Sequence, residues 1–451
     1  MNRFLTLGAV LAVSAMCTAD LAAQAKPADP TKAVIRANKE FTVRGGLPNF
    51  YKKLADGKHV KIAYFGGSIT AQNGWRPQSL DYFRKLYPKA KVDQINAAIG
   101  GTGSALGAFR IEHDVLRHKP DLVFVEFAVN DAGTGPVGIR RAMEGIVRHI
   151  WRALPETDIC FVYTFTANDL QNLLKGKMKR STSVMEDVAD YYNIPSIHMG
   201  LGAVELARQG KLIMKADSKG MTKVSGKDLN ISADVPITKD GKIPFSKDGV
   251  HPYENTGHVL YTNALKKALP EIAKAGKPGT HLPLPAPVMK DNYEFSKVVS
   301  LDAPGIKLSG PVVKQTDKDI PARSFMNRMP GIWKLAPGAT IEFKFKGTMA
   351  SLYNLIGPGC GLMEITVDGQ KPRNARLFDP YCTYYRIANM GLLGLSADKV
   401  HTVKIKILDQ TFDKRKILFK HNQPDFDKNP QKYAGKDAYI GAIFILGDIV
   451  K

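Results

Sequence analysis

The sequence predicts an α/β domain with a parallel sheet over residues 59–275, followed by an all-β sandwich or jelly-roll domain over residues 290–451. Three observations predict this division. In the first part, short apolar runs alternate with helical periodicities, as in parallel sheets covered by helices on both faces. From about residue 290, apolar and polar residues alternate along strand-length segments separated by turns. At 451 residues, the chain is also too long for one ordinary core.

The amino-terminal residues have the composition of a secretory signal peptide. Arg3 precedes an apolar run over residues 4–17, and a small-residue Ala-x-Ala site ends at Ala25. We therefore expect residues 1–25 to be removed by cleavage after Ala25, and the mature protein to be exported to the periplasm or the extracellular space. Residues 26–58 are then an N-terminal extension. No later run approaches the ~20 apolar residues that span a bilayer, so no transmembrane segment is expected.

The net charge indicates which classes of partner the protein can attract. The sequence has 64 Lys and Arg residues against 42 Asp and Glu residues, a formal charge of +22. Such a surplus attracts anions such as acidic polysaccharides, lipid headgroups or nucleic acid. The excess is spread over many lysines, and no nucleic-acid-binding motif is present. We expect a solvated, lysine-rich surface and no nucleic-acid partner.

Three cysteines follow the predicted signal peptide. Export permits a disulfide, and Cys360 and Cys382, both next to turn residues, are the favoured pair. Cys160 lies in an apolar run and is predicted to be a buried thiol. Cys17 falls inside the signal peptide, and lipidation there is the lesser alternative because Met16 is unfavourable before a lipidated cysteine.

The elements of the first domain follow from its apolar periodicity. The apolar run at 121–129 is typical of a central parallel strand buried on both faces. The clearest helix covers residues 139–154, where apolar side chains recur at intervals of three and four. The predicted strands cover residues 62–65, 92–95, 121–129, 159–165 and 195–198. One predicted helix begins at Pro77. The other predicted helices cover residues 106–116, 139–154, 181–192 and 253–269.

Two segments interrupt this alternation. Residues 209–247 are rich in Lys, Gly, Ser and Asp, and we expect an inserted hairpin or loop over the carboxyl edge of the sheet. Residues 276–289 contain repeated prolines and are predicted to be a linker with polyproline character. The all-β domain then has strand patterns at 340–346, 362–367, 400–408 and 438–450.

Four short blocks stand where strands or loops would deliver them to one edge of the sheet. In open α/β sheets, ligands bind at the carboxyl ends of the strands. Each block alone has an ordinary structural explanation as a turn or a helix cap, but their joint occurrence at this edge points to a site. The blocks are Gly66-Gly67-Ser68, Asn96 to Gly103, Glu126 to Asp131, and Asp248 to Pro252.

The order and spacing of these blocks resembles the SGNH hydrolases, also called the GDSL family of esterases and lipases, over roughly residues 59–270. The last block, Asp248-x-x-His251-Pro252, is the most specific part of the resemblance. The family's fold is a flavodoxin-like parallel sheet flanked by helices. The resemblance implies that Ser68 is the nucleophile, His251 its base, and Asp248 the group that orients the base.

The resemblance also implies an oxyanion hole made by the backbone N–H groups of Ser68 and Gly101 and by the side-chain amide of Asn130. Two positions depart from the family's pattern. Gly67 stands where the family usually has aspartate, and Ala128 stands where its third block usually has glycine. Neither departure removes a group that performs a chemical step.

The same residues suit ester hydrolysis on chemical grounds alone. A serine hydroxyl needs a base to take its proton during attack, and a histidine oriented by a carboxylate can do so. Fixed donors must then meet the negative charge that develops on the carbonyl oxygen. This chemistry requires no metal or other cofactor, and the sequence has no His/Cys cluster with zinc spacing.

Trp75 and Arg76 follow the nucleophile closely and are candidates for substrate binding. Trp75 could stack on a sugar ring, and Arg76 could hold an acidic group. The alternative is that Trp75 belongs to the core and that Arg76 lies on the surface. Both interpretations remain open at this point.

The leading hypothesis is a secreted serine esterase that removes small acyl groups, acetyl above all, from a carbohydrate. Export, a β-domain like those attached to carbohydrate esterases and a basic surface suited to acidic glycans favour an acylated polysaccharide or oligosaccharide as substrate. The alternatives are hydrolysis of lipid or small-molecule esters, acyl transfer, and a non-catalytic glycan-binding protein. The sequence leaves the glycan, the acyl position and the oligomeric state open.

Overall fold

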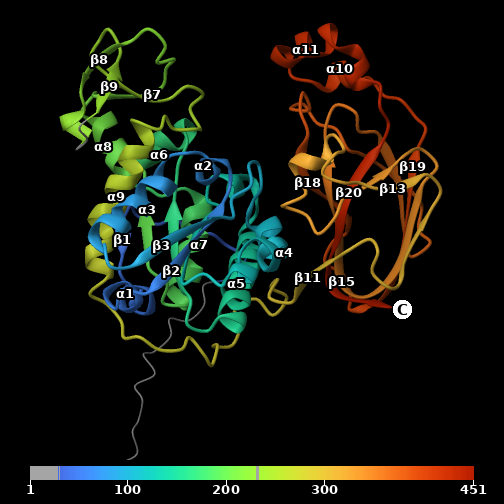
Figure 1. The fold of residues 1–451 in the computed structure, drawn as a ribbon, viewed down its shortest axis with the longest axis horizontal. Coiled ribbons are helices and arrows are strands. Elements are labelled where there is room, and N and C mark those ends of the chain that lie inside the picture. Colours follow the sequence, from blue (N-terminus) through green and yellow to red (C-terminus); the bar gives the residue numbers. More distant parts are fainter. Residues whose placement is uncertain (1–28, 30, 230–232, 451) are drawn as a thin grey trace, which may run out of the picture.

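The computed structural model describes residue 29 and the ranges 31–229 and 233–450. The predicted signal peptide at 1–25 lies outside these residues. Among the helices of the described part, none is long and apolar enough to cross a membrane. Figure 1 shows an α/β domain and a β-domain side by side, with helices α4 and α5 on the side of the α/β domain that faces the β-domain.

The α/β domain is built on a six-stranded sheet in the order β1-β6-β5-β4-β2-β3. The five strands predicted from the sequence are present and run parallel to one another, which confirms the predicted fold class. The N-terminal extension adds an edge strand, because β1 pairs antiparallel with β6. The strands are β1 (Phe41–Thr42), β2 (His59–Gly66), β3 (Lys91–Asn96), β4 (Leu122–Glu126), β5 (Asp158–Tyr163) and β6 (Ser196–His198).

Helices cover both faces of this sheet because its central strands are apolar on both sides. Along β2, Ala63 and Phe65 pack against α4, α5 and α7, whereas Ile62 and Tyr64 pack against α1, α3 and α9. The helices are α1 (Pro48–Ala55), α2 (Ser68–Ala71), α3 (Trp75–Leu86), α4 (Ser104–Asp114), α5 (Pro136–Ala153), α6 (Leu170–Leu174), α7 (Arg180–Tyr191), α8 (Leu201–Arg208) and α9 (Gly257–Ile272). Short 3₁₀ helices are η1 (Leu116–His118), η2 (Asn130–Gly133) and η3 (Ala167–Asp169).

The segment predicted as an insertion forms a small lobe. It contains the predicted hairpin, β8 (Thr222–Ser225) with β9 (Asp234–Ile237), and a parallel pair, β7 (Leu212–Lys215) with β10 (Ile243–Ser246). The 3₁₀ helix η4 (Gly226–Leu229) follows β8. In Figure 1 this lobe lies at the same end of the domain as α2, which directly follows β2. The lobe therefore stands at the carboxyl edge of the sheet.

The predicted all-β fold of the second domain is confirmed as a large antiparallel sheet. Its two long strands, β15 and β20, pair along most of their length, and the two halves of β15 have different neighbours, β19 and then β18. The strands are β11 (Ser296–Val299), β12 (Ile306–Ser309), β13 (Val312–Lys314), β14 (Trp333–Leu335), β15 (Thr340–Ile356), β16 (Leu362–Val367), β17 (Arg373–Arg376), β18 (Arg386–Leu393), β19 (Lys399–Leu408) and β20 (Ala438–Val450). The short helices are η5 (Ala322–Ser324), α10 (Lys414–Ile417), η6 (Lys420–Asn422), α11 (Gln423–Lys428) and η7 (Pro430–Tyr433).

The two domains share a hydrophobic core. Phe109 of α4 stacks on Phe444 of β20 with ring centroids 5.0 Å apart, and Phe444 stacks in turn on Tyr353 of β15 at 4.6 Å. The predicted linker also packs along α5, where Glu144 accepts hydrogen bonds from the backbone N–H groups of Val288 and Met289. The β-domain is thus held against the α/β domain by buried contacts.

The predicted disulfide is wrong. Cys360 and Cys382 are both buried free thiols, and each is bonded within its own loop. The Cys360 thiol lies 3.9 Å from the carbonyl oxygen of Leu355, and the Cys382 sulfur accepts the N–H of Asp379 at 3.2 Å. Cys160 is a buried free thiol, as predicted.

Candidate active site

Ser68 is presented by a sharp strand-to-helix turn. Strand β2 ends at Gly66, and Ser68 is the first residue of α2. A side chain at Gly66 could not be accommodated, because its Cβ would lie 2.6 Å from the carbonyl oxygen of Glu126 and 2.8 Å from the Thr70 hydroxyl. The close approach of the Glu126 backbone and the Thr70 side chain therefore requires glycine at this turn. It places Ser68 at the carboxyl edge of the sheet, as the sequence predicted.

The last sequence block brings His251 and Asp248 to Ser68. The Ser68 Oγ lies 2.8 Å from Nε2 of His251, and Nδ1 of His251 lies 2.7 Å from Oδ2 of Asp248. The other oxygen of Asp248 accepts the backbone N–H groups of Val250 and His251, each at 2.8 Å. Gly249, with φ of +86°, permits this tight loop. The three predicted side chains thus form one line of hydrogen bonds.

The electrostatics keep Asp248 charged. Partial burial alone would raise the pKa of its carboxyl group, but hydrogen bonds from the His251 ring and from two backbone N–H groups outweigh burial and lower that pKa. A carboxylate that stays ionised can accept the Nδ1–H of His251 and stabilise the imidazolium. His251 itself keeps 39% of its side-chain surface exposed, so the site is reachable from solvent.

The three predicted oxyanion donors are N–H groups at or next to the Ser68 turn: a Cβ on Gly67 would lie 2.0 Å from Asn130 Oδ1, and a Cβ on Gly100 would lie 3.5 Å from Ser68 Cβ. They are the backbone N–H of Ser68, the backbone N–H of Gly101 in a turn with φ of +75°, and the side-chain amide of Asn130 at the start of η2. Within the part of the chain that the structure describes, none of these donors has a protein acceptor. Free donors at this point could meet a developing oxyanion. The structure joins Ser68, His251 and Asp248 by hydrogen bonds, whereas the roles of Gly101 and Asn130 as oxyanion donors stay a prediction.

The structure also explains the glycine that stands in place of the usual aspartate. A Cβ on Gly67 would lie 2.0 Å from Oδ1 of Asn130, far inside van der Waals contact. The Asn130 side chain therefore packs directly against the backbone at position 67. Any side chain at this position would displace the amide that is predicted to serve the oxyanion hole.

Asp131 connects η2 to the turn that carries Gly101. Its Oδ1 accepts the backbone N–H of Ser104 at 3.0 Å, and a Cβ on Gly103 would lie 2.3 Å from the same oxygen. The carboxyl group is almost fully buried, and burial raises its pKa to about 6. Asp131 thus fixes the Gly101 turn relative to Asn130.

Replacing Asp131 with asparagine is expected to stabilise the protein in a pH-dependent way. The pKa of the Asp131 carboxyl group is raised in the folded protein above its unfolded value of about 4. The stability of the wild-type protein therefore falls as the pH rises from about 4 to about 6. Asparagine keeps the acceptor for Ser104 without a charge to bury. Scanning calorimetry should show near-equal midpoints at pH 4 and a variant that is more stable at pH 7 by roughly 3 kcal/mol. An advantage that is equal at both pH values would contradict this explanation.

Two further buried charged residues support the site. Glu126, directly below the turn, accepts the hydroxyl groups of Thr70 at 3.0 Å and Thr164 at 2.7 Å, and burial raises its pKa. Arg110 of α4 donates to the carbonyl oxygen of Gly66 at 3.2 Å and pairs with Asp114 at 2.7 Å. The sequence analysis missed Arg110, although an arginine on the apolar face of a helix is a signal of a buried polar network.

The structure contradicts a direct substrate-binding role for Trp75 and Arg76. Trp75 is completely buried and packs edge-on against Tyr64 and Phe124. Arg76 is also buried and donates to the carbonyl oxygen of Thr70 at 3.2 Å and to Gln94. Neither side chain can face a ligand, because Trp75 belongs to the core and Arg76 binds the end of α2.

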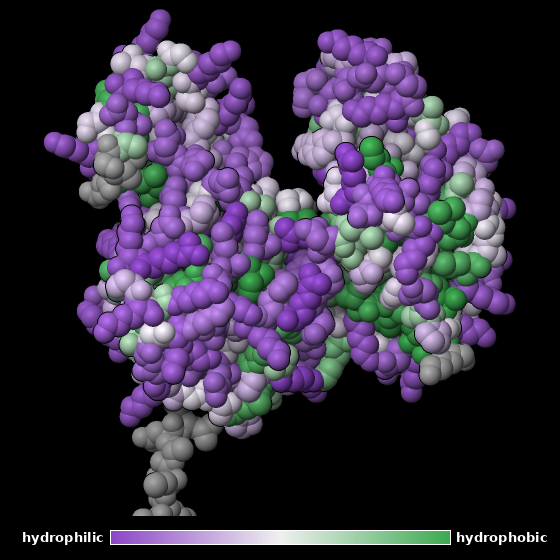
Figure 2. Space-filling view, in the orientation of Figure 1, coloured by the Kyte–Doolittle hydropathy of each residue, from purple (hydrophilic) through white to green (hydrophobic). Residues whose placement is uncertain are grey.

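The surface around α2 is hollowed. Figure 2 shows a hollow between the lobe that carries β7 to β9 and the β-domain, and α2 lies at its lower end in Figure 1. The visible walls of the hollow are mainly hydrophilic. Among the described residues, no group of three or more His, Cys, Asp or Glu side chains is placed to hold a metal ion.

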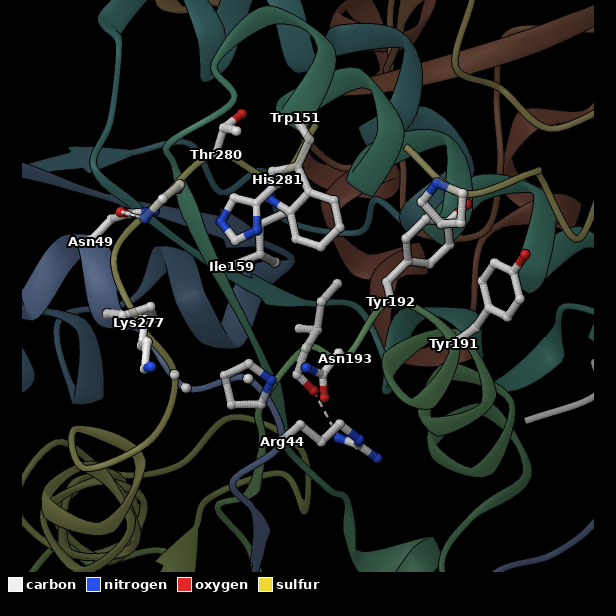
Figure 3. Close-up of a pocket in the computed structure, with 18 of the residues that line it drawn as sticks. Arg44, Asn49, Trp151, Ile159, Tyr191, Tyr192, Asn193, Lys277, Thr280 and His281 are labelled. Carbon is white, nitrogen blue, oxygen red and sulfur yellow. Dashed lines mark hydrogen bonds between the residues drawn. The ribbon is translucent and has the colours of Figure 1, made fainter. Parts of the chain in front are cut away.

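A large cavity lies elsewhere, at the amino-terminal edge of the sheet. It has a volume of about 820 Å³ and is lined by the start of β5, the end of α7 and the linker (Figure 3). Polar groups in its wall are already bonded: Asn49 exchanges two hydrogen bonds with the backbone of Gly279, and the His281 ring stacks on Trp151 at 4.3 Å. These contacts attach the linker to the α/β domain, on the edge opposite Ser68.

Comparison with known proteins gives a family match over part of the chain and a fold for both domains. Residues 64–218 match the GDSL-like Lipase/Acylhydrolase family. None of the curated proteins compared with the chain matches it in sequence. A crystal structure of a two-domain esterase active on acetylated mannans, co-crystallised with mannopentaose, has 20% identity and a TM-score of 0.67, and covers 93% of this chain and 100% of its own.

A second crystal structure of a two-domain esterase active on acetylated mannans gives nearly the same values, with 19% identity, a TM-score of 0.67, and coverage of 92% and 99% of the two chains. At this identity, the likeness establishes that both domains and their order are shared as a fold. Residues 64–218 therefore resemble the GDSL-like lipase/acylhydrolases in sequence, and the chain as a whole has the fold of the two-domain esterases.

Proposed function

We propose that the protein is a secreted esterase that removes acetyl groups from an acetylated polysaccharide through a Ser68 acyl-enzyme. The hydrogen-bonded line from Ser68 through His251 to Asp248, with distances of 2.8 and 2.7 Å, carries the proposal. Two short, aligned contacts are what proton transfer from a serine hydroxyl to a histidine requires.

The reaction proceeds in two halves. The Ser68 Oγ attacks the acetyl carbonyl carbon while His251 Nε2 takes the hydroxyl proton, and Asp248 stabilises the imidazolium. The carbonyl oxygen becomes an oxyanion, which the N–H groups of Ser68, Gly101 and Asn130 meet. Collapse of this intermediate breaks the bond between the carbonyl carbon and the sugar oxygen, and His251 gives its proton to that oxygen, which leaves as a sugar hydroxyl.

Water completes the cycle. His251 takes a proton from a water molecule that attacks the acetyl-Ser68 carbonyl, and the same donors hold the second oxyanion. Acetate leaves when the bond to Ser68 Oγ breaks, and His251 returns its proton to that oxygen. The proton transfers run along the contacts of His251 with Ser68 and Asp248, and the proposed chemistry requires no cofactor.

The substrate class rests on the surroundings of Ser68. A hydrophilic hollow suits a hydrated sugar chain better than a long acyl chain, which needs an apolar channel. The formal charge of +22 favours a polysaccharide that carries acidic groups. The structurally similar esterase acts on acetylated mannans, which agrees with the proposal without identifying the glycan here.

Acetate release across a panel of acetylated polysaccharides, neutral and acidic, tests the proposal. We expect release from at least one member of the panel and weak activity on 4-nitrophenyl esters with acyl chains longer than about four carbons, because a hydrophilic hollow gives such chains no apolar contact. Ser68→Ala protein is the control for background hydrolysis. Strong activity on long-chain esters with no acetate release from any polysaccharide would favour the second candidate, a lipid esterase.

A further inference from the structure

Three aromatic side chains are exposed together on the β-domain. The exposed fractions are 53% for Tyr381, 58% for Tyr384 and 38% for Phe419. Tyr381 and Phe419 meet edge to face with ring centroids 4.8 Å apart, and His421 stacks on Phe419 at 5.6 Å. We call Tyr381, Tyr384 and Phe419 the aromatic platform. Exposed apolar groups that gather in one place on a folded protein mark an interaction surface.

The platform is held in place by charged groups beneath it. The guanidinium of Arg386 lies 5.5 Å from the ring centre of Tyr381 and 5.7 Å from that of Tyr384. Asp379 accepts a hydrogen bond from Arg386 at 2.5 Å and another from the backbone N–H of Tyr381 at 2.9 Å. The rings are thus pre-organised, which lowers the entropy that binding would cost. Across the described residues, neither tyrosine hydroxyl has a hydrogen-bond partner.

The contacts between the domains place the platform near the edge of the sheet that carries Ser68. Arg328 of the β-domain donates to the carbonyl oxygen of Asn96 at 2.9 Å, at the carboxyl end of β3. The backbone carbonyl of Arg328 accepts the hydroxyl of Tyr353 at 3.1 Å, and Tyr353 pairs with Asn389 of β18.

Strand β18 leads from this contact to the platform. Arg386 begins β18 three residues before Asn389, which is about 10 Å along a strand. In Figure 1, β18 lies on the side of the β-domain that faces the α/β domain, and α10 and α11 lie above it across the hollow from the β7 to β9 lobe. The segments that carry the platform adjoin β18 and α10, and they therefore lie across the hollow from the β7 to β9 lobe.

The chemistry of the platform fits a polysaccharide. A tyrosine ring offers a flat apolar face for the C–H face of a sugar ring and a hydroxyl for its polar rim. The adjoining segment, residues 411–436, has seven basic and three acidic residues, so it repels a second copy of itself and attracts a chain with acidic groups. We propose that the aromatic platform binds sugar units of the same polysaccharide chain whose ester is hydrolysed at Ser68. This inference rests on the proposed function.

The test compares a triple variant with a matched control in the full chain. The triple variant combines Tyr381→Ala, Tyr384→Ala and Phe419→Ala. The control is Phe295→Ala, which removes a 58% exposed ring that lies 4.2 Å from the guanidinium of Arg152, near β11. Each protein is assayed for hydrolysis of 4-nitrophenyl acetate and for acetate release from the polysaccharide panel. Binding is measured by retardation in gels that contain the same polysaccharides. For this assay, each protein also carries Ser68→Ala.

The triple variant is expected to keep its activity on 4-nitrophenyl acetate, because the small ester does not reach the platform. Its KM for the acetylated polysaccharide should rise by about 2- to 10-fold for each ring that a sugar unit contacts, with kcat little changed. Gel retardation should weaken in parallel. The Phe295→Ala protein should behave as wild type in every assay.

Unchanged KM and retardation in the triple variant would overturn the platform proposal while leaving the proposed function intact. If the wild-type protein releases no acetate from any polysaccharide of the panel, the proposed function is overturned. If a polysaccharide then retards the Ser68→Ala protein but not the triple variant, sugar binding at the platform is still supported without its link to hydrolysis. If no polysaccharide retards any of the proteins, the platform proposal is overturned. A change in oligomeric state in the triple variant alone would identify the patch as a protein contact and also overturn the proposal.

Discussion

Replacing Ser68 with alanine is expected to lower kcat for 4-nitrophenyl acetate by about 10,000-fold or more. The structure leaves no second hydroxyl at 2.8 Å from His251 Nε2 among the hydrogen bonds of the described residues, so the nucleophile has no substitute there. His251→Ala is expected to cause a loss of similar size, because the serine hydroxyl then keeps its proton. Steady-state hydrolysis of 4-nitrophenyl acetate measures both losses.

The double variant makes the test sharper. Because Ser68 and His251 act as a unit, removing both should cost little more than removing either one. Ser309→Ala, a change at an exposed serine of β12, controls for nonspecific effects and should keep wild-type activity. Circular dichroism should be the same for all four proteins. If the losses from the two single variants multiplied in the double variant, Ser68 and His251 would not form one catalytic unit.

Local sequence patterns predicted the turn at Ser68 and the loop from Asp248 to His251, and the family resemblance supplied their roles. The run from Ile62 to Phe65 followed by two glycines predicts a strand and a sharp turn, and the structure has β2 ending at Gly66 and α2 starting at Ser68. The spacing of Asp248 and His251 lets one short loop form both of its hydrogen bonds. These features depend on neighbours in sequence, which is why a single sequence reveals them.

Residues whose environment is set by distant segments were harder to predict. Trp75 lies on an amphipathic helix, but periodicity does not say whether its face is open or covered. In the structure the side chain is buried, and His258 Nδ1 of α9 accepts the backbone N–H of Trp75 at 3.3 Å. Arg76 looked exposed because it is charged, yet backbone carbonyls at the end of α2 satisfy it. Cys360 and Cys382 are similar, because turn propensity does not fix the direction of a thiol.

Gly67 is the clearest case of such a long-range constraint. Its nearest neighbour in space is Asn130, 63 positions later in the chain, and only the parallel pairing of β2 with β4 brings the two together. Seen in sequence alone, glycine here is a departure from the family's pattern without a reason. In the structure, it is the residue that lets the Asn130 amide reach the Ser68 turn.

This contact predicts that Gly67→Ala will be as harmful as removing Asn130. Loss of one oxyanion donor typically lowers kcat by about 100- to 1,000-fold, which is the effect expected for Asn130→Ala. An alanine Cβ at position 67 would lie 2.0 Å from Asn130 Oδ1, so the amide must rotate away from the oxyanion hole. Gly67→Ala should therefore lower kcat by a similar factor, while Ser68 and His251 remain in place.

Two comparisons separate this mechanism from a general disturbance of the loop. Gly135→Ala, in the loop after η2, adds the same methyl group where no atom lies within 4 Å, and it should keep nearly full activity. In the combined Gly67→Ala and Asn130→Ala variant, the amide is already absent and the methyl group has nothing to displace. The combined loss of kcat should then be close to that of Asn130→Ala alone. A combined loss equal to the product of the two single losses would mean that Gly67 acts through the backbone of Ser68 and not through Asn130.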